Sequence, residues 1–377
     1  MRTQCPHRRY PAVIVFAITC IGLVAHAQQG LQTERSGKMQ NMTRIGVVQT
    51  VPISAENAKG DPQLNPYSEQ FDAARVREKV IEPNIAHFTQ RLRRAGESGC
   101  DLVLLTEDTQ GVSSWLFCGD RPDVQQAVAE TIPGPTTDAF GAVAREFGMY
   151  IVAGLMEKDG DHIYNTAVLI GRDGGIAGKY HKTHLPLIEA AGVTAGDTFP
   201  VFDTDFGRVG MLVCYDWIFP EAAACIAAQG ADMICVPTMA YGWSEDGGEA
   251  TLKCRAADHS VVVAISTYPR QFWPGRSGIA NRAGQIVADC GYDMDGICFA
   301  DVDVSAYRYD KFVEDLSISD LGGRLFLARR PEIYTPLTDP NSPANQTHSA
   351  KPHLQDRYDM AQVMKRVHEM WGYEGEK

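Results

Sequence analysis

Three ionisable side chains of different chemistry each follow a short apolar run that has the pattern of a buried strand. They are Glu107 after Leu102–Leu105, Lys182 after Ile176–Tyr180, and Cys214 after Val209–Val213. Strand ends in layered α/β folds open onto the surface where binding and catalytic sites are built. We therefore take this acid, cation and thiol as the first candidates for a functional site.

Cys214 stands directly before a predicted helix that has Pro220 just inside its start. Backbone N–H groups at such a turn favour a thiolate and, later in a reaction, a tetrahedral oxyanion. A buried structural cysteine is the alternative interpretation, because free cysteine is among the most buried residue types. The residues that flank Cys214 favour the nucleophile.

The three side chains suit the cleavage of an unactivated C–N bond. Thiolate attack by Cys214 divides the reaction into two easier steps through a covalent acyl thioester. Glu107 would take the thiol proton, return it to the departing amine and then activate water. Lys182 would stabilise the oxyanion together with the Tyr215 backbone N–H, each such donor contributing about 3 kcal/mol. This chemistry requires neither a metal nor an organic cofactor, and taken singly Glu107 and Lys182 also fit a solvated acid and a surface lysine.

The segment GRVGMLVCYDWIFPE at residues 207–221 closely resembles the nucleophile segment of the nitrilase superfamily of carbon-nitrogen hydrolases. Upstream, YHKTHLP at residues 180–186 resembles the lysine segment of that family, and LVLLTE at residues 102–107 resembles its glutamate segment. The order Glu, Lys, Cys is the family's own. Thr106 stands where the family usually has proline. The resemblance covers about residues 43–335.

This resemblance implies a four-layer α-β-β-α sandwich of the carbon-nitrogen hydrolase type and a catalytic triad of Glu107, Lys182 and Cys214. It also implies a homodimer or a larger even-numbered homo-oligomer, because protomers of the family pair through a helical layer. Glu189 matches a second glutamate that positions lysine and substrate, with an exposed loop acid as the alternative. Trp217 is expected to line the pocket or to pack in the core.

The residues after the nucleophile bear on the substrate class. True nitrilases tend to carry Cys-Trp-Glu, whereas Cys214-Tyr215-Asp216 looks like the amidase and carbamoylase branches. Residues 329–334 also resemble the end of the catalytic domain in carbamoyl-amine hydrolases. We therefore predict hydrolysis of a small amide or N-carbamoyl amine. A nitrilase, an acyltransferase of the same superfamily and a non-catalytic secreted binding protein remain the alternatives.

The elements that must position these residues follow a repeated alternation of short apolar strands and amphipathic helices. Strands are predicted at residues 44–50, 102–105, 150–155, 163–170, 176–180, 209–213, 233–236 and 261–266. Helices are predicted after Pro83, from a cap at Thr136 or Thr137 to Phe147, at residues 220–229 and at residues 248–258. Hairpins are expected around residues 172–175 and 281–284.

The two ends of the chain differ from this pattern. Residues 1–27 combine early arginines, an apolar run and an Ala-x-Ala site, which predicts a secretory signal peptide and export to the periplasm or outside the cell. A membrane anchor is the alternative. Residues 28–43 read as a linker, residues 44–335 as the hydrolase domain, and residues 336–377 as a C-terminal extension. An amphipathic helix at about residues 354–370 is expected to dock on a neighbouring subunit.

Composition narrows the class of partner. The chain has 377 residues, of which 44% are hydrophobic and 22% charged, as in a folded globular protein. There are 47 Asp and Glu against 35 Lys and Arg, a net charge of -12, which disfavours nucleic acid and favours a small-molecule substrate. Ten cysteines are too sparse for a disulfide scaffold. His181 and His184 have no third ligand nearby, so we predict structural histidines and no metal.

Overall fold

A computed structural model describes residues 42–53, 60–239, 246–269, 275–292, 295–304, 329–346 and 359–373. The predicted signal peptide and nearly all of the predicted linker lie outside the described residues. Within the described ranges, every helix is too short or too polar to cross a lipid bilayer.

Two six-stranded sheets form the centre of the fold. The first sheet has the order β12 (Gly296–Asp303), β1 (Met42–Gln49), β2 (Leu102–Leu104), β3 (Tyr150–Asp159), β4 (His162–Ile170), β5 (Ile176–His181). The second has the order β11 (Ile286–Asp289), β10 (Gly278–Ala280), β9 (Val262–Ser266), β8 (Met233–Pro237), β7 (Gly207–Met211), β6 (Val201–Thr204). Strands β1, β2 and β3 are parallel, as are β7, β8 and β9. Strand β4 pairs antiparallel with β3, and β6 and β10 pair antiparallel with β7 and β9.

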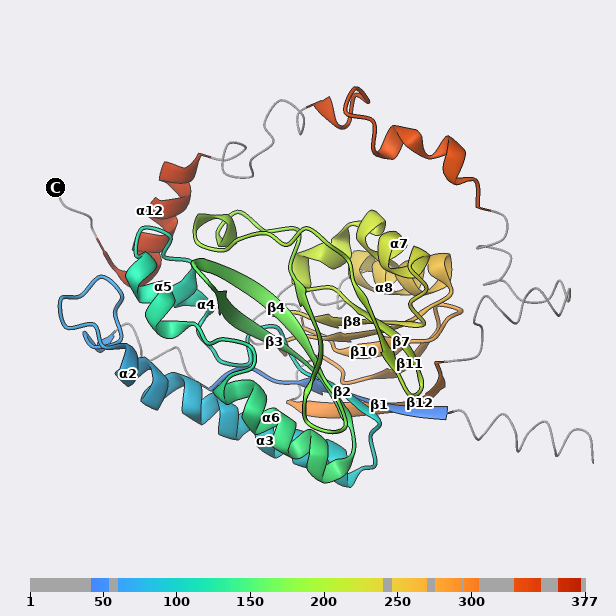
Figure 1. The fold of residues 1–377 in the computed structure, drawn as a ribbon, viewed down its shortest axis with the longest axis horizontal. Helices are drawn as coiled ribbons and strands as arrows, with labels where there is room; N and C mark the ends of the chain where they lie inside the picture. The colour runs from blue at the N-terminus through green and yellow to red at the C-terminus, as the bar shows by residue number, and fades with distance from the viewer. Residues whose placement is uncertain are drawn as a thin grey trace, which may run out of the picture. The chain divides into compact units, whose positions relative to one another are not determined.

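Side-chain alternation along the strands divides the core into layers. Leu102 and Leu104 of β2 face a core shared with the second sheet, whereas Val103 faces the helices α3 (Glu82–Glu97) and α6 (Pro135–Phe147). These two helices lie side by side over the first sheet (Figure 1). The amphipathic pattern predicted after Pro83 is thereby explained, because Phe88 and Leu92 are fully buried.

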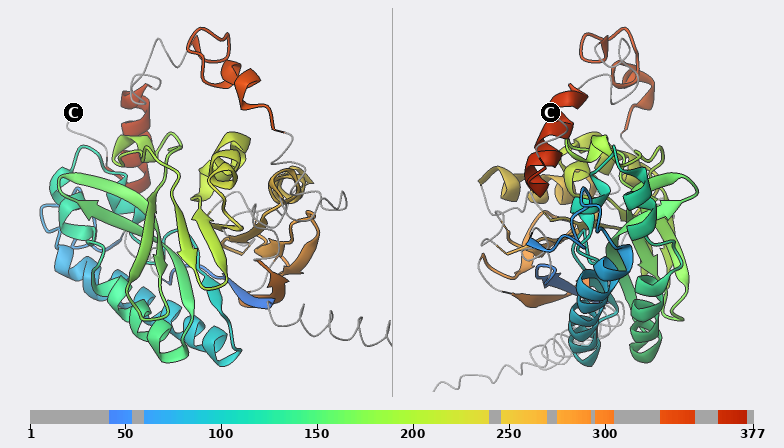
Figure 2. Two further views of the ribbon diagram at one scale, coloured as in Figure 1. Left: turned by 45° about the vertical axis from the view of Figure 1, so that its right-hand side comes forward. Right: turned by 90° about the vertical axis from the view of Figure 1, so that its left-hand side faces the viewer.

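The second sheet is covered by α7 (Pro220–Ala228) and α8 (Asp246–His259), on the side opposite to α3 and α6 (Figure 2). Gly210 of β7 allows α7 to approach closely, since a Cβ there would lie 2.2 Å from Cγ2 of Ile226. The layers are therefore helix, sheet, sheet, helix. The predicted four-layer α-β-β-α sandwich is confirmed.

Two predicted helix starts were wrong. The helix expected after Pro83 begins earlier, with α2 (Ala73–Val76) and a π turn (Arg77–Ile81) running directly into α3. The wide turn lies just before Pro83, which lacks the N–H of a regular helix. In α6 the capping residue is Gly134, not a threonine, and Thr137 instead accepts a 2.8 Å hydrogen bond from the Gly134 N–H. Pro135 is the first helical residue, because its fixed φ suits that position, so the capping residue is Gly134 directly before it.

Short elements complete the described fold. They are α4 (Ser113–Leu116), α5 (Pro122–Val128), η3 (Glu189–Ala191), η4 (Cys214–Ile218), η5 (Pro331–Ile333), η6 (Thr335–Leu337) and α12 (Met360–Trp371). The amphipathic C-terminal helix is thus present from residue 360, while residues 347–358 lie outside the description. Helix α12 packs against its own chain. Docking of the extension on a second subunit stays a prediction.

Candidate active site

Lys182 occupies the centre of the candidate site. It follows the last residue of β5, and its side chain is fully buried. Its Nζ donates hydrogen bonds to Oε1 of Glu107 at 2.9 Å and to Oε1 of Glu189 at 2.7 Å. Burial opposes the ammonium charge, but the two carboxylates outweigh it and raise the pKa of Lys182 well above its ordinary value. Lys182 is therefore a permanent cation held between two acids.

Glu107 is fixed at both carboxylate oxygens. Oε1 accepts from Nζ of Lys182 and, at 2.7 Å, from Nδ2 of Asn165, and Oε2 accepts from the Met239 N–H at 2.9 Å. The turn that presents Glu107 is tied to β3, since the Gly154 N–H donates to the Thr106 carbonyl at 3.0 Å. A Cβ at Gly154 would lie 1.9 Å from the Glu107 carbonyl oxygen. Backbone contacts with β3 thus hold the turn at Thr106 and Glu107, in which Thr106 stands where the family usually has proline.

Glu189 lies in η3 and is buried rather than exposed. Its Oε1 accepts from Lys182 and, at 3.5 Å, from Nδ2 of Asn165. Its Oε2 is buried and has no hydrogen-bond partner within the described part of the chain. Burial raises the pKa of Glu189 to about 7, against the opposing effect of the Lys182 charge. This carboxylate therefore has one oxygen available to a bound molecule.

Cys214 lies in a strained turn. Strand β7 ends at Met211, and Cys214 opens the 3-10 turn η4 with a φ of 45°, in the left-handed region that side chains rarely adopt. Burial raises the pKa of the Cys214 thiol to about 12; the negative charge of Glu107 adds to this, while Lys182 and a hydrogen bond with Thr238 oppose it. The thiol shares one electrostatic environment with the Glu107 and Lys182 pair, and it is protonated at neutral pH.

Asp216 ties the nucleophile turn to the lysine segment. Its Oδ2 accepts from the Tyr180 hydroxyl at 2.8 Å and from the Val213 N–H at 3.0 Å. Its Oδ1 accepts from the His184 N–H at 2.8 Å and from the Thr183 hydroxyl at 2.9 Å. Asp216 is fully buried. It thereby fixes the residues on both sides of Lys182 relative to the residue before Cys214.

Comparison with known proteins identifies the family. The profile of the carbon-nitrogen hydrolase family matches residues 63–311, well over half of the chain. The chain belongs to the carbon-nitrogen hydrolase family. The predicted membership of the nitrilase superfamily is confirmed.

Characterised relatives of this hydrolase differ in their substrates. It is 34% identical over 269 residues to a nitrilase of Pyrococcus abyssi, covering 68% of this chain and 95% of that protein. It is 32% identical over 250 residues to the omega-amidase of Homo sapiens, covering 60% and 84%. It is 28% identical over 274 residues to a citrullinase of Francisella tularensis, covering 67% and 91%. The family is shared, while the substrate varies.

Solved structures share the fold. An amidase from Nesterenkonia sp. AN1 matches the hydrolase with a TM-score of 0.53 at 23% identity, covering 72% of this chain and 94% of that one. A carbon-nitrogen hydrolase from Helicobacter pylori G27 matches with a TM-score of 0.58 at 22% identity, covering 79% and 98%. These similarities agree with the α-β-β-α sandwich seen here.

Two further predicted site residues adjoin the nucleophile of the hydrolase. The half-buried ring of Tyr215 meets the Phe219 ring edge-on, with centroids 5.2 Å apart. Trp217 is buried in the core cluster that contains β7, β8, α7 and α8. Its Nε1 is buried without a hydrogen-bond partner among the described residues. Trp217 therefore packs in the core, and its predicted place in the lining of the pocket stays a prediction.

Sequence reasoning assigned no role to three further residues at this site. Asn165 holds both carboxylates, and its carbonyl accepts from the Lys182 N–H at 2.9 Å. Thr238 bonds the thiol. Burial raises the pKa of the Tyr268 phenol, and the charges of Asp108, Glu107 and Cys214 add to this effect, so Tyr268 lies near the same centre. The available signal was Asn165 itself, an amide side chain within the predicted strand at residues 163–170.

The two histidines of the lysine segment have protein partners. His181 Nε2 lies 2.9 Å from Oε2 of Glu157, and His184 Nδ1 lies 2.8 Å from Oδ1 of Asp216. Across the described ranges, no group of three or more His, Cys, Asp or Glu side chains is arranged to hold a metal ion. Each histidine thus holds a buried carboxylate in place.

Proposed function

We propose that this hydrolase cleaves a small linear amide or N-carbamoyl amine through a thioester on Cys214. The observation that carries the proposal is the fully buried Lys182, held between Glu107 and Glu189 beside a protonated thiol. A base, a fixed cation and a nucleophile then share one dry environment, in which charge stabilisation is strong.

Acylation begins with proton transfer. Because burial raises the pKa of Cys214 to about 12, the thiol needs a base, and Glu107 is the carboxylate beside it. As Sγ attacks the carbonyl carbon, the π electrons move to the oxygen, whose negative charge faces Lys182 and the Tyr215 N–H. When the intermediate collapses, the C–N bond breaks and Glu107 returns the proton to the departing nitrogen. Ammonia or an amine leaves, and the acyl group stays on sulfur.

Deacylation repeats the same steps with water. Glu107 takes a proton from the attacking water, the second tetrahedral intermediate loses the sulfur, and the thiol regains its proton. The acid product leaves. Glu189 supports both halves of the reaction in two ways. Its Oε1 holds the Lys182 ammonium, and its unpartnered Oε2 offers an acceptor to an N–H of the substrate.

The preference for amides over nitriles rests on Cys214-Tyr215-Asp216, which resembles the amidase and carbamoylase branches. The names of two relatives, an omega-amidase and a citrullinase, support it, whereas a third relative is a nitrilase. A transferase of this superfamily would pass the acyl group to an amine. We further propose export after removal of residues 1–27 and an even-numbered homo-oligomer, to be tested by the mass of the mature chain and by size-exclusion chromatography.

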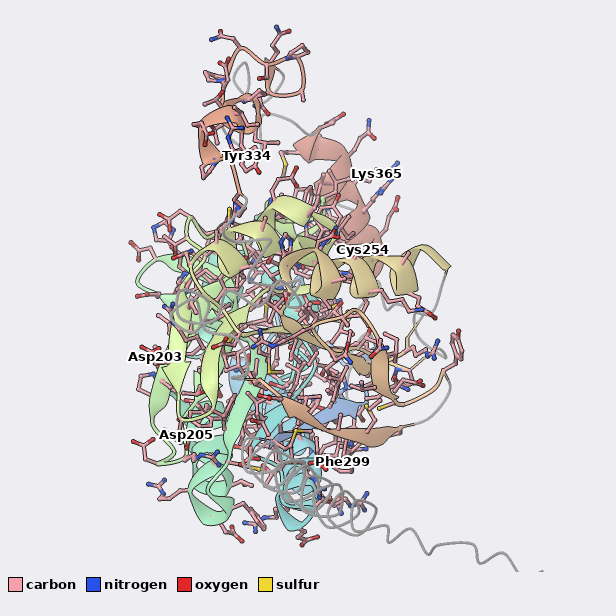
Figure 3. The ribbon with its side chains drawn as sticks, turned by 90° about the vertical axis from the view of Figure 1, so that its right-hand side faces the viewer. Asp203, Asp205, Cys254, Phe299, Tyr334 and Lys365 are labelled. Carbon is pink, nitrogen blue, oxygen red and sulfur yellow. The ribbon has the colours of Figure 1, made fainter. Side chains whose placement is uncertain are left out.

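The test is a substrate screen of short amides, N-carbamoyl amines and nitriles with released ammonia as the readout. Cys214→Ala is compared with Cys254→Ala, because Cys254 is an exposed thiol on α8 (Figure 3). We expect turnover in the wild type and in Cys254→Ala, and none in Cys214→Ala. The intact mass of the wild type during turnover should show an acyl adduct, which should be absent from Cys214→Ala. Retained turnover in Cys214→Ala would exclude the sulfur mechanism, and loss of free acid when an amine is added would indicate a transferase.

A further inference from the structure

Helix α12 belongs to the extension beyond the family-matched residues 63–311, yet it is firmly docked on the hydrolase domain. Its buried face consists of Val363, Val367 and Trp371. The Trp371 ring lies 5.0 Å from the Trp115 ring, and its Nε1 donates to the Ser114 carbonyl at 3.3 Å. Figure 1 shows α12 beside α4 and α5.

Polar contacts fix the orientation of this helix. His368 Nε2 lies 2.7 Å from Oδ2 of Asp120, and the Tyr67 hydroxyl donates to Oδ1 of the same aspartate at 2.9 Å. The Tyr67 ring stacks on Tyr373, with centroids 4.6 Å apart. An apolar face and a directional polar pair together specify one docked position.

The turn beneath α12 is η3, which carries Glu189. Helix α12 packs against η3, and Ala190 belongs to the same apolar cluster as Val367 and Trp371. Helix α5 also holds the end of this turn, since Nε2 of Gln125 donates to the Gly192 carbonyl at 2.9 Å. The turn is therefore held by both α12 and α5, and Glu189, the residue next to Ala190, accepts a hydrogen bond from Lys182.

We propose that α12 is a positioning element of the active site, which keeps η3 in place so that Glu189 stays buried against Lys182. Val367 and Trp371 are then positioning residues that act through Glu189. This inference rests on the proposed function, because it assigns the helix an effect on that same reaction. It assigns the extension a role in turnover, in addition to any contribution to stability.

Loosening of η3 has a defined electrostatic consequence. Glu189 faces Lys182 from β5, Glu107 from the turn after β2, the Asn165 amide from β4 and Cys214 from the η4 turn. If η3 moves outward, Glu189 becomes hydrated, and its pKa falls from about 7 toward its ordinary value. Lys182 also loses one of its two acceptors. Both changes alter the reaction centre while the sheets stay intact.

The experiment compares Trp371→Ala and the milder Val367→Ala with Arg366→Ala, an exposed position on the same helix. We expect kcat/KM to fall by roughly 10- to 100-fold in Trp371→Ala, as for other small displacements of a catalytic group. The loss should be smaller in Val367→Ala and within about twofold in Arg366→Ala. In wild type, kcat/KM should rise with pH around pH 7 as Glu189 ionises. In Trp371→Ala this rising limb of the pH profile should move to lower pH. A folded Trp371→Ala variant with unchanged kcat/KM and an unchanged limb would overturn the proposal.

A double-mutant cycle tests the route through Glu189. If α12 acts through this carboxylate, adding Trp371→Ala to Glu189→Gln should cost little further activity. Independent, multiplying losses would overturn the route. The rate at which iodoacetamide alkylates Cys214 reads the same centre without a substrate, and it should change in Trp371→Ala but not in Arg366→Ala. Failure of the proposed function would appear separately, as turnover retained in Cys214→Ala.

Discussion

Two clusters of carboxylates and cations meet at the end of β5, with opposite electrostatic outcomes. The inner cluster joins Lys182 to Glu107 and Glu189, and it is completely buried. The outer cluster is formed by Glu157, which accepts from Lys179 at 2.6 Å and contacts His181 at 2.9 Å. Adjacent residues of a strand point to opposite faces, so His181 and Lys182 enter different clusters.

The difference lies in the ratio of acceptors to donors. Burial opposes the charge of Glu157, but hydrogen bonds from His181, Lys179 and Thr166 outweigh it and lower its pKa. In the inner cluster two carboxylates share one ammonium, so burial raises the pKa of Glu189 to about 7 and its Oε2 stays unpartnered among the described residues. A fully satisfied cluster stabilises the fold. A cluster that is short of donors retains capacity for a proton and a substrate.

The largest expected effect comes from exchanging the cation of each cluster. Lys182→Gln leaves two buried carboxylates without an ammonium, so we expect turnover to fall by at least about 10²- to 10³-fold. Stability should fall by about 3–5 kcal/mol. Lys179→Gln leaves the buried Glu157 with the contacts from His181 and Thr166, so the loss of stability should be smaller than in Lys182→Gln and turnover should stay near wild type. Ammonia release and urea unfolding measure both, and equal effects of the two variants would remove the distinction between the clusters.

A smaller loss is expected when the connection between the two turns is cut. Asp216→Asn replaces a carboxylate that accepts at both oxygens with a group that cannot accept from both the Val213 N–H and the His184 N–H in the same geometry. We expect kcat to fall roughly 10- to 100-fold and the free energy of unfolding to fall by about 2 kcal/mol. Asp203→Asn is the matched control, since Asp203 lies on the surface with its side chain 85% exposed (Figure 3). Wild-type kcat in Asp216→Asn would show that the connection has no part in positioning the nucleophile.

The smallest effects concern the pH dependence of stability, and they should differ in sign between the clusters. The pKa of Glu189 is raised to about 7 in the folded state, above the roughly 4.3 of an unfolded chain, so its ionisation destabilises the fold as pH rises between these values. Glu189→Gln should therefore gain stability relative to wild type from pH 5 to pH 8. The pKa of Glu157 is lowered, so the deficit of Glu157→Gln should be full at neutral pH and shrink as pH falls below about 4.3. Urea unfolding across this range measures both slopes, and parallel curves would contradict the comparison.

Local sequence patterns predicted the elements well where one principle dominated. Strand alternation and turn residues located β4 and β5, and apolar runs located β8 and β9 within a residue or two. Errors arose where two signals competed. Helix α6 is capped by Gly134 instead of a threonine, because Pro135 is its first residue. The helix expected to begin after Pro83 begins before it, because a π turn accommodates the proline.

The sequence by itself determined the family, and through the resemblance of three short motifs it predicted the layered fold and proposed Glu107, Lys182 and Cys214 as the triad. Only the tertiary structure decided that Asn165 and the Met239 N–H orient Glu107, and that Glu189 is buried with a free oxygen. It also decided that α12 lies against the turn that carries Glu189. These contacts join residues far apart in the chain, and burial and electrostatic coupling arise only when the sheets and turns pack together.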